Sequence, residues 1–504
     1  MSSSLNLRVV GDPCRGGRFL VKECPMPINT CDRVTPFHPL HAARRLSVAV
    51  VALVLALVTV AGAETELVFW NFWDQKFITP VIQKFEALHP GVKIRSEQLN
   101  WGNGLDKIVV ALANDRAPDI CELGSTWTGK FMSEGVLLDL TERVSDLRDQ
   151  YHLWEPAIWE GRIYGMPWLV GTRVLFYNRG LFKAAGLDPD RPPSTWDQLL
   201  AAAKTIHQPE KGLYGFGVNA GEGHILYKKF LPFVWGNGGS IIDEKGKFCF
   251  DSPATREALE FYRRLMVYGL KEKQDILDDA FKRGRLGLEI SGSWNFAKYP
   301  KEAPDLDFGT ALIPAPAADR GTSSSFLGGE ILVLFRNCRD PQLATEFIRF
   351  LTRAEHTLPI TKEALVSFPA NKEAFADEFF TKNPRLGVFV KQMETGVHPP
   401  VHPLWIELES IVNDAVEKVL YGGSIDEVLG AAATAYERVS LQFEERKRAV
   451  SPSAVPSDGQ AVQAVPAAGL PGWAILLLAL IAVGTVVNAI LLVFIYGEVK
   501  KNAA

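Results

Sequence analysis

Apolar and polar residues alternate with two different periods along residues 64–121, and these periods predict strands and helices in turn. The apolar run Leu67–Trp70 predicts a strand, and apolar residues at helical spacing follow it as far as Pro90. The same order of strand and helix repeats once, and a third strand pattern begins at Pro118. A βαβαβ run of this kind predicts an α/β fold with a mainly parallel, doubly wound sheet, in which ligands bind beyond the carboxyl ends of the strands.

Helix ends are marked in the second half of the chain. Pro253 follows a serine and Pro341 follows an aspartate, so each stands at the favoured first position of a predicted helix. A further helix is predicted from about Leu404 to the pair Gly422-Gly423. Helices therefore continue to the end of the large central part of the chain, near residue 448.

The longest apolar run is the uncharged stretch Trp473–Tyr496, whose roughly 24 residues would span about 36 Å as a helix. Lys500 and Lys501 follow it, whereas residues 449–472 before it hold no lysine or arginine. The sequence therefore predicts a transmembrane helix at 473–496 with the tail 497–504 in the cytoplasm and the rest outside. The alternative, a buried core helix, is rarely this long and this uniformly apolar.

Residues 1–63 have the pattern of a targeting segment. A basic pair at residues 44–45 precedes the apolar stretch Leu46–Val60 and an A-x-A site that ends at Ala63, which predicts a secretory signal peptide. The extension before residue 44 is rich in proline and holds three cysteines. A start codon placed too early, with Met26 as the true start, is one explanation, and a metal-binding cysteine tract of unfamiliar spacing is another.

Composition limits the possible class of protein that the central part of the chain, residues 64–448, can form. Its roughly 385 residues are too many for one ordinary core and suggest two lobes. The formal net charge of −4 excludes a strongly basic nucleic-acid binder. Cys121, Cys249 and Cys338 allow at most one disulfide, so the fold depends on its apolar core. Residues 449–472, rich in alanine, proline, valine and serine, are predicted to be a linker.

Enzyme signatures are mostly absent from the sequence. It has no G-x-S-x-G, no phosphate loop ending in G-K-S/T and no H-E-x-x-H, so we expect neither catalysis nor a cofactor nor a metal. His398 and His402 stand in a proline-rich segment that is predicted to be a surface loop. The sequence leaves open a catalytic pair of carboxylates like that of a glycosidase, because carboxylates are plentiful and no feature of the sequence selects one pair.

Tryptophans are the most informative side chains. Several of the twelve stand where a strand gives way to a glycine-rich loop, a position in which an indole face can stack on the C–H face of a sugar. Core packing is the alternative for each of them. The tryptophans that we predict to be packing or surface residues instead are Trp101, Trp154, Trp159 and Trp196.

Ten short segments occur in order along nearly all of residues 66–439. Among them are LVFWNFWD at 67–74, APDICELGSTW at 117–127, AFKRGRLGLEISGSW at 280–294 and FLGGEILVL at 326–334. In this order the segments resemble the extracellular solute-binding proteins of the carbohydrate class, relatives of maltose-binding protein that serve ABC importers.

The resemblance implies a two-lobed, type II periplasmic-binding-protein-like fold with doubly wound sheets and a sugar-binding cleft between the lobes. We expect one lobe at 64–170 with 330–365 and the other at 171–329 with 366–448. The crossover hinges are expected near Leu169–Arg173, Leu327–Ile331 and Leu365–Pro369.

Eight ligand-binding candidates follow when the cleft positions of the family are carried over one at a time. Trp294 and Trp405 stand in the segments that match best. The full set is Trp73, Asp74, Glu122, Trp127, Trp235, Trp294, Glu330 and Trp405.

The resemblance also implies a function and partners. The domain would bind a carbohydrate on the periplasmic side of the bacterial inner membrane, close its lobes and dock on ABC permease subunits, with the ATPase acting indirectly. The C-terminal helix would hold it to the membrane. The alternatives are a membrane-anchored sugar receptor for a signalling partner and a carbohydrate-cleaving enzyme. The sequence does not identify the sugar, because related clefts also accept glycerol-phosphate esters. The predicted cleft segments show no cluster of arginine and lysine suited to a phosphate, although Lys76 and Arg173 are close to them.

Overall fold

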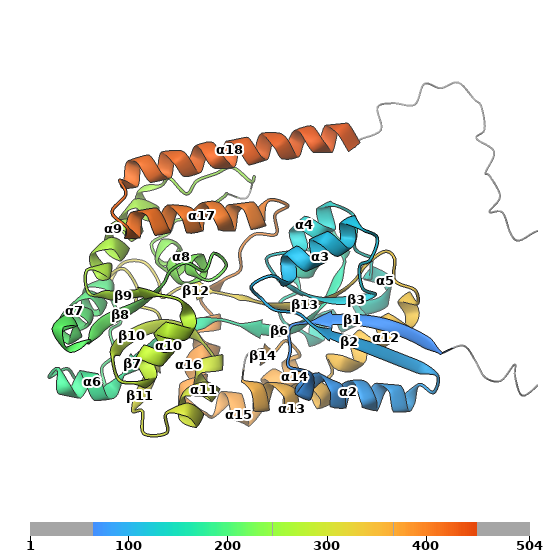
Figure 1. Ribbon diagram of the computed structural model, residues 1–504, viewed down its shortest axis with the longest axis horizontal. Coiled ribbons are helices and arrows are strands. Elements are labelled where there is room, and N and C mark those ends of the chain that lie inside the picture. The colour runs from blue at the N-terminus through green and yellow to red at the C-terminus, as the bar shows by residue number, and fades with distance from the viewer. Residues whose placement is uncertain (1–63, 244, 366, 451–504) are drawn as a thin grey trace, which may run out of the picture. The chain divides into compact units, whose positions relative to one another are not determined.

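The computed structural model describes residues 64–243, 245–365 and 367–450. Two β-sheets form the framework of these residues, and Figure 1 shows them as separate groups of strands. The first sheet has six strands in the order β14-β6-β13-β3-β1-β2. In that order their bounds are Phe368–Pro369, Gly165–Gly171, Gly328–Leu334, Ile120–Gly124, Thr65–Asn71 and Val92–Gln98.

The second sheet has five strands in the order β11-β7-β10-β8-β9. In that order their bounds are Phe308–Ala311, Arg173–Asn178, Leu286–Gly292, Tyr214–Asn219 and Gly269–Glu272. Two small ladders complete the strands: β4 (Ile158–Trp159) with β5 (Arg162–Ile163), and β12 (Ser325–Phe326) with β15 (Gly396–Val397).

Both large sheets are mixed, which corrects the prediction of mainly parallel sheets. In the first sheet β1 pairs in parallel with β2 and β3, as the βαβαβ pattern predicted. The remaining pairs, β3 with β13, β13 with β6 and β6 with β14, are antiparallel. The second sheet likewise has two parallel and two antiparallel pairs. The prediction was wrong because its βαβαβ argument covered only residues up to 121, whereas β13 returns from a distant part of the sequence to lie beside β3.

The chain crosses from one sheet to the other between neighbouring strands. Only Thr172 separates β6 from β7, and only Leu327 separates β12 from β13. Gly329 lies where β13 passes β6 so closely that a Cβ atom there would be 1.9 Å from the Leu169 carbonyl oxygen. Only glycine fits this approach. After β14, which belongs to the first sheet, the chain returns to helices that pack against the second.

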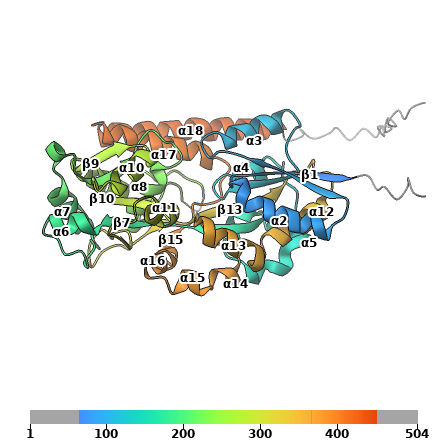
Figure 2. The same cartoon turned by 60° about the horizontal axis from the view of Figure 1, so that its bottom comes forward.

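Helices flank both sheets, and Figure 2 shows them from a second side. Those in the segments of the first sheet are α2 (Gln75–Leu88), α3 (Gly104–Ala113), α4 (Thr128–Ser133), α5 (Thr141–Val144), α12 (Pro341–Leu351), α13 (Ala354–Ala364) and α14 (Lys372–Phe375). Those in the segments of the second are α6 (Arg179–Ala184), α7 (Trp196–Ile206), α8 (Leu226–Gly236), α9 (Pro253–Met266), α10 (Gln274–Lys282), α11 (Trp294–Glu302), α15 (Glu378–Thr381), α16 (Pro384–Met393) and α17 (Trp405–Leu420).

The predicted helix starts and stops are confirmed by their caps. The Ser252 hydroxyl accepts a hydrogen bond from the Thr255 N–H at 3.2 Å, and the Asp340 carboxylate accepts one from the Leu343 N–H at 3.0 Å. Each satisfies a backbone donor that the first turn leaves open. Helix α17 ends just before Gly422, whose φ of +95° suits glycine.

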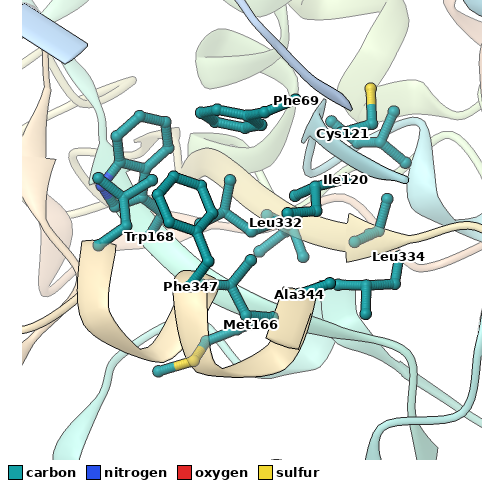
Figure 3. Close-up of a cluster of buried hydrophobic side chains, with 14 of the residues drawn as sticks. Phe69, Ile120, Cys121, Met166, Trp168, Leu332, Leu334, Ala344 and Phe347 are labelled. Atoms are coloured by element: carbon teal, nitrogen blue, oxygen red, sulfur yellow. The ribbon is translucent and has the colours of Figure 1, made fainter. Parts of the chain in front are cut away.

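The core of the first sheet is packed with large apolar side chains. Phe69 and Phe347 meet edge to face at 5.5 Å between ring centroids, and Trp168 is fully buried. Figure 3 shows these rings beside Leu332 and Met166, which come from strands far apart in the sequence. Among the described residues all three cysteines are free, so apolar burial holds this fold together without a disulfide.

The last described helix is α18 (Ile425–Val450). It contains the boundary between two compact units of the chain, Met1–Gly430 and Ala431–Ala504. No helix among the described residues is both long and apolar enough to cross a membrane. The predicted signal peptide, the transmembrane helix at 473–496, the tail, and the predicted linker from residue 451 onward all lie outside the described residues.

Candidate ligand-binding site

A cavity lies between the two sheets at the crossovers, all within the unit Met1–Gly430. It encloses about 590 Å³ of space free of atoms, part of which is open to solvent. Residues of both sheets line it, because strand ends converge there, as expected for an α/β protein. Its lining comes from Trp101, residues 124–127, residues 171–173, Lys228, Ser293-Trp294, Phe326, residues 328–330 and Ser367.

Aromatic rings form much of the cavity wall. The Trp101 ring stacks on Phe72 with centroids 4.0 Å apart and lies 5.3 Å from the Trp127 ring. Trp294 and Phe326 line the cavity from the segments around the second sheet. Flat apolar faces of this kind suit the C–H faces of a sugar ring.

The Gly-Ser-Trp turn before α11 has a steric reason for its glycine. The Trp294 ring folds back over Gly292 so closely that a Cβ atom at residue 292 would lie 1.8 Å from the ring. Only a glycine allows this approach, because any side chain would displace the indole. The turn thereby sets the position of Trp294 at the cavity.

Three charged side chains line the cavity: Arg173, Lys228 and Glu330. Burial lowers the pKa of Arg173 to about 10 and that of Lys228 to about 8. Burial also raises the pKa of Glu330 to about 7, against the opposing effect of the positive charges on Lys228 and Arg173. Each shift reflects the cost of holding a charge away from water.

A second carboxyl, Glu122, lies deeper than the cavity wall. It is fully buried on β3 and accepts a hydrogen bond from the Phe72 N–H at 2.8 Å. Burial and then the nearby charge of Glu330 raise the pKa of Glu122 well above its usual value. Its role in the described structure is therefore to tie β3 to the end of β1, not to line the cavity.

A buried hydrogen-bonded cluster lies beside the cavity. Glu409 on α17 accepts hydrogen bonds from the Tyr227 hydroxyl and from the Trp405 indole N–H, the latter at 3.1 Å. Thr126, at the end of β3, also hydrogen-bonds to Glu409. The cluster joins α8 and α17 to the edge of the first sheet, so it fixes the wall on which Lys228 stands.

The structure brings three of the eight predicted residues to the cavity: Trp127, Trp294 and Glu330. Trp405 is 1% exposed and belongs to the Glu409 cluster. Trp235 stands behind Phe326, with the two rings stacked at 6.4 Å.

The two candidates that follow the first strand have structural roles here. Trp73 is buried against Trp168 with ring centroids 5.5 Å apart. Asp74 caps α2 by accepting a hydrogen bond from the Lys76 N–H at 3.0 Å. Neither lines the described cavity.

The aromatic and charged cavity residues that lay outside the predicted set are Trp101, Arg173, Lys228 and Phe326. Trp101 packs on Phe72 as a packing residue was predicted to do, and it also lines the cavity, which its loop, without a distinctive motif, did not indicate. Arg173 is the last residue of a predicted crossover and was named as close to the predicted cleft, but it was not included among the ligand-binding candidates. Lys228 had no signal in the sequence, since one lysine on an amphipathic helix does not reveal which cavity it faces.

The site offers aromatic faces, hydroxyl groups and three charged side chains as binding groups. Among the described residues, no three histidine, cysteine or acidic side chains are grouped so that they could hold a metal ion. His398 and His402 lie in a segment without helix or strand, as predicted, and both side chains are half-buried. Burial lowers the pKa of both, and that of His398 to about 4.

Known proteins resemble this chain in sequence and in fold. A putative binding protein of Brucella abortus is 27% identical over 369 residues, which cover 71% of this chain and 88% of that protein. The diacetylchitobiose-binding protein of Streptomyces coelicolor is 26% identical over 64% of this chain and 76% of its own length. The solved structure of a Thermotoga lettingae ABC transporter solute-binding protein bound with α-D-tagatose has a TM-score of 0.67 at 25% identity, over 73% of this chain and 98% of that one.

A family model described as bacterial extracellular solute-binding protein matches residues 74–357. This match covers more than half of the chain and includes both large sheets except β1 and β14. The two-lobed α/β fold expected from the sequence is therefore confirmed at the level of the family. The chain belongs to the bacterial extracellular solute-binding proteins.

Proposed function

We propose that this chain is the extracytoplasmic sugar-binding subunit of an ABC importer. The cavity carries the proposal: it has four aromatic side chains and several hydroxyl groups, and it lies between the two sheets. Aromatic faces with convergent polar groups are typical of carbohydrate sites. The relatives that bind diacetylchitobiose and tagatose support the same ligand class.

Delivery by closure of the lobes is the proposed mechanism. The short crossovers at Thr172 and Leu327 join the sheets beside the cavity, so rotation about them would change the distance between its two walls. A ligand that contacts both walls favours the closed form by its extra contacts there. The closed form would then dock on the permease, whose ATPase subunit acts from the cytoplasm.

A membrane tether is part of the proposal and rests on the sequence of residues 449–504. The uncharged stretch Trp473–Tyr496 would anchor the chain in the cell membrane, with the binding domain on the periplasmic side. A linker of roughly 24 residues would reach about 27 Å as a flexible coil and about 75 Å if fully extended as polyproline. Tethering of that reach gives effective concentrations on the order of millimolar toward a neighbouring permease.

Two other functions use the same site. A membrane-anchored sugar receptor would bind the same ligand and report it to a signalling partner. A carbohydrate-cleaving enzyme would need a pair of acidic groups at a substrate, and Glu330 is the single carboxylate that lines the described cavity.

Binding, uptake and product analysis together test the proposal. The full chain, screened by thermal shift and then by calorimetry against mono- and oligosaccharides, should bind at least one of them and return it intact. A strain without the gene should lose import of that sugar. Unchanged import would contradict the transport role and favour the receptor, and a cleaved sugar would favour the enzyme.

A further inference from the structure

The cavity holds two half-buried cations, Arg173 and Lys228, that form no ion pair within the described part of the chain. The Arg173 guanidinium lies over the Phe326 ring at 5.2 Å and near the Trp294 ring at 5.7 Å. Lys228 Nζ lies 5.4 Å from the same Phe326 ring, so both cations flank one aromatic side chain. Within the described part of the chain, neither has a carboxylate within the 4 Å of an ion pair, and the buried Arg173 Nε has no hydrogen-bond partner.

The neighbouring lysine has a different environment. Lys229 Nζ, one residue further along α8, donates a hydrogen bond to the Gln274 side chain. The negative charges of Glu289 and Asp278 are also close enough to stabilise its positive charge. Lys229 therefore has a hydrogen-bond partner within the fold. Lys228 donates no hydrogen bond within the described part of the chain, although the charges of Glu409 and Glu330 also favour its charged form.

Glu330 and Glu409 lie near the cavity, but among the described residues neither forms an ion pair with Arg173 or Lys228. Glu330 is the only carboxylate among the lining residues of this cavity, and its raised pKa shows that its own charged form is disfavoured. Glu409 is buried outside the lining and is already occupied by Tyr227 and Trp405. Withdrawing two like charges from water costs more free energy than an aromatic face returns. A ligand can offset this cost if it brings negative charge.

We propose that the ligand of this cavity is a sugar or polyol that carries an oxyanion, a carboxylate or a phosphate, held between Arg173 and Lys228. This inference rests on the proposed function and narrows its ligand class. The sugar ring would stack on Trp101 and Trp127, and the oxyanion would accept hydrogen bonds from the fork of the guanidinium and from the ammonium. Arg173 and Lys228 both stand on the cavity wall that the segments of the second sheet form. An anion bound to them would draw that wall toward Trp101 and Trp127 on the side of the first sheet.

Matched ligands test the inference and separate the two sources of the anion. Calorimetry with the full chain would compare glucose, glucuronate and glucose 6-phosphate, then the corresponding galactose set, and then glycerol with glycerol 3-phosphate. We expect a carboxylate or a phosphate member to bind at least about tenfold more tightly than its neutral partner. Tighter binding of the sugar acids would identify the anionic group of the ligand as a carboxylate. Tighter binding of the phosphate esters would identify it as a phosphate.

Variants show whether the two cations cause that preference. Arg173→Gln and Lys228→Gln should each weaken binding of the anionic ligand about tenfold or more and leave any binding of its neutral partner within about threefold. Arg173→Lys and Lys228→Arg should retain part of the preference. Arg385→Gln is the matched control, because its guanidinium also lies over a ring, Phe308 at 4.3 Å, but does not line the cavity.

The outcomes distinguish this inference from the proposed function. If neutral sugars bind as tightly as their anionic partners, or if the glutamine variants weaken both equally, the cations serve sugar hydroxyls and the inference is wrong while the function stands. If no sugar or polyol of either kind binds, the proposed function is wrong and the inference with it. Thermal unfolding of each variant without ligand checks the fold, since loss of an unpaired half-buried cation should not lower Tm.

Discussion

Trp294 stands at the cavity because Gly292 leaves room for its ring. Its neighbour Asn295 is fully buried and hydrogen-bonded to Asp278, so the indole projects from a rigid turn. A ring held in this way binds a sugar face with little loss of side-chain entropy.

Replacing Trp294 with alanine should therefore weaken binding of the sugar by about 1 kcal/mol or more, roughly fivefold, through lost stacking. Calorimetry measures the affinity, and thermal unfolding checks the fold. Trp159→Ala is the control, because Trp159 is also half-buried and does not line the cavity. Equal affinity of the Trp294 variant and the parent would remove this ring from the site.

Glu122 shows how burial makes stability depend on pH. Its pKa in the folded protein is raised well above the usual 4.5, so between these two values the folded state binds more protons than the unfolded state. The contribution of Glu122 to the free energy of unfolding therefore falls as pH rises through that interval.

Glu122→Gln, which resembles the protonated acid in shape and can still accept from the Phe72 N–H, should remove this fall. Its free energy of unfolding relative to the parent should rise from pH 4 toward pH 8, as measured by urea titration at each pH. Glu142→Gln, at an exposed site, is the control. If the free energies of unfolding of Glu122→Gln and the parent change with pH in parallel, the buried carboxyl does not cause the pH dependence of stability.

At the scale of elements, a polar network under the second sheet joins α10 to α11. Asp278 on α10 accepts hydrogen bonds from the side chains of Gln274 at 2.6 Å and Asn295 at 2.7 Å, and it forms an ion pair with Lys298 at 3.0 Å. It is 3% exposed, so water cannot replace these bonds. The network thereby fixes the start of α11, where Trp294 stands.

Asp278→Ala should lower the free energy of unfolding by about 3 to 5 kcal/mol, because it leaves buried donors and a partly buried cation without a partner. The next residue provides a matched control: Asp279 pairs with Lys282 at 2.7 Å, but its side chain is 51% exposed. Asp279→Ala should cost about 1 kcal/mol or less. Equal losses for the two variants in urea unfolding would contradict the structural role of the network.

At the scale of the whole molecule, the proposed anchor and the binding domain should be separable. Deleting residues 473–504 should move the protein from the membrane to the soluble fraction and leave its affinity for the sugar unchanged. Cell fractionation and calorimetry measure the two effects. A deletion of the charged tail alone, residues 500–504, is the control and should stay in the membrane. Loss of binding in the longer deletion would mean that residues 473–504 contribute to the fold.

The helices and strands whose signals come from residues close together in the sequence could be predicted from the sequence. Alternation of apolar residues located β1, β2 and β3, and the caps at Ser252 and Asp340 located the starts of α9 and α12. Such signals are local, because periodicity and capping involve residues within about one or two turns of one another. The resemblance to a family, carried by short segments in order, indicated the two-lobed fold.

The cavity depended on contacts that no local pattern encodes. Arg173 and Lys228 are more than fifty residues apart, and they flank Phe326 only because β7, α8 and β12 meet at one end of the second sheet. The same tertiary packing places Trp405 in the Glu409 cluster and Trp101 at the cavity wall. By itself the sequence determined the class, the compartment to expect and the order of the elements. Only the tertiary structure decided which side chains share the cavity, because burial and neighbouring charge depend on the packing of segments distant in sequence.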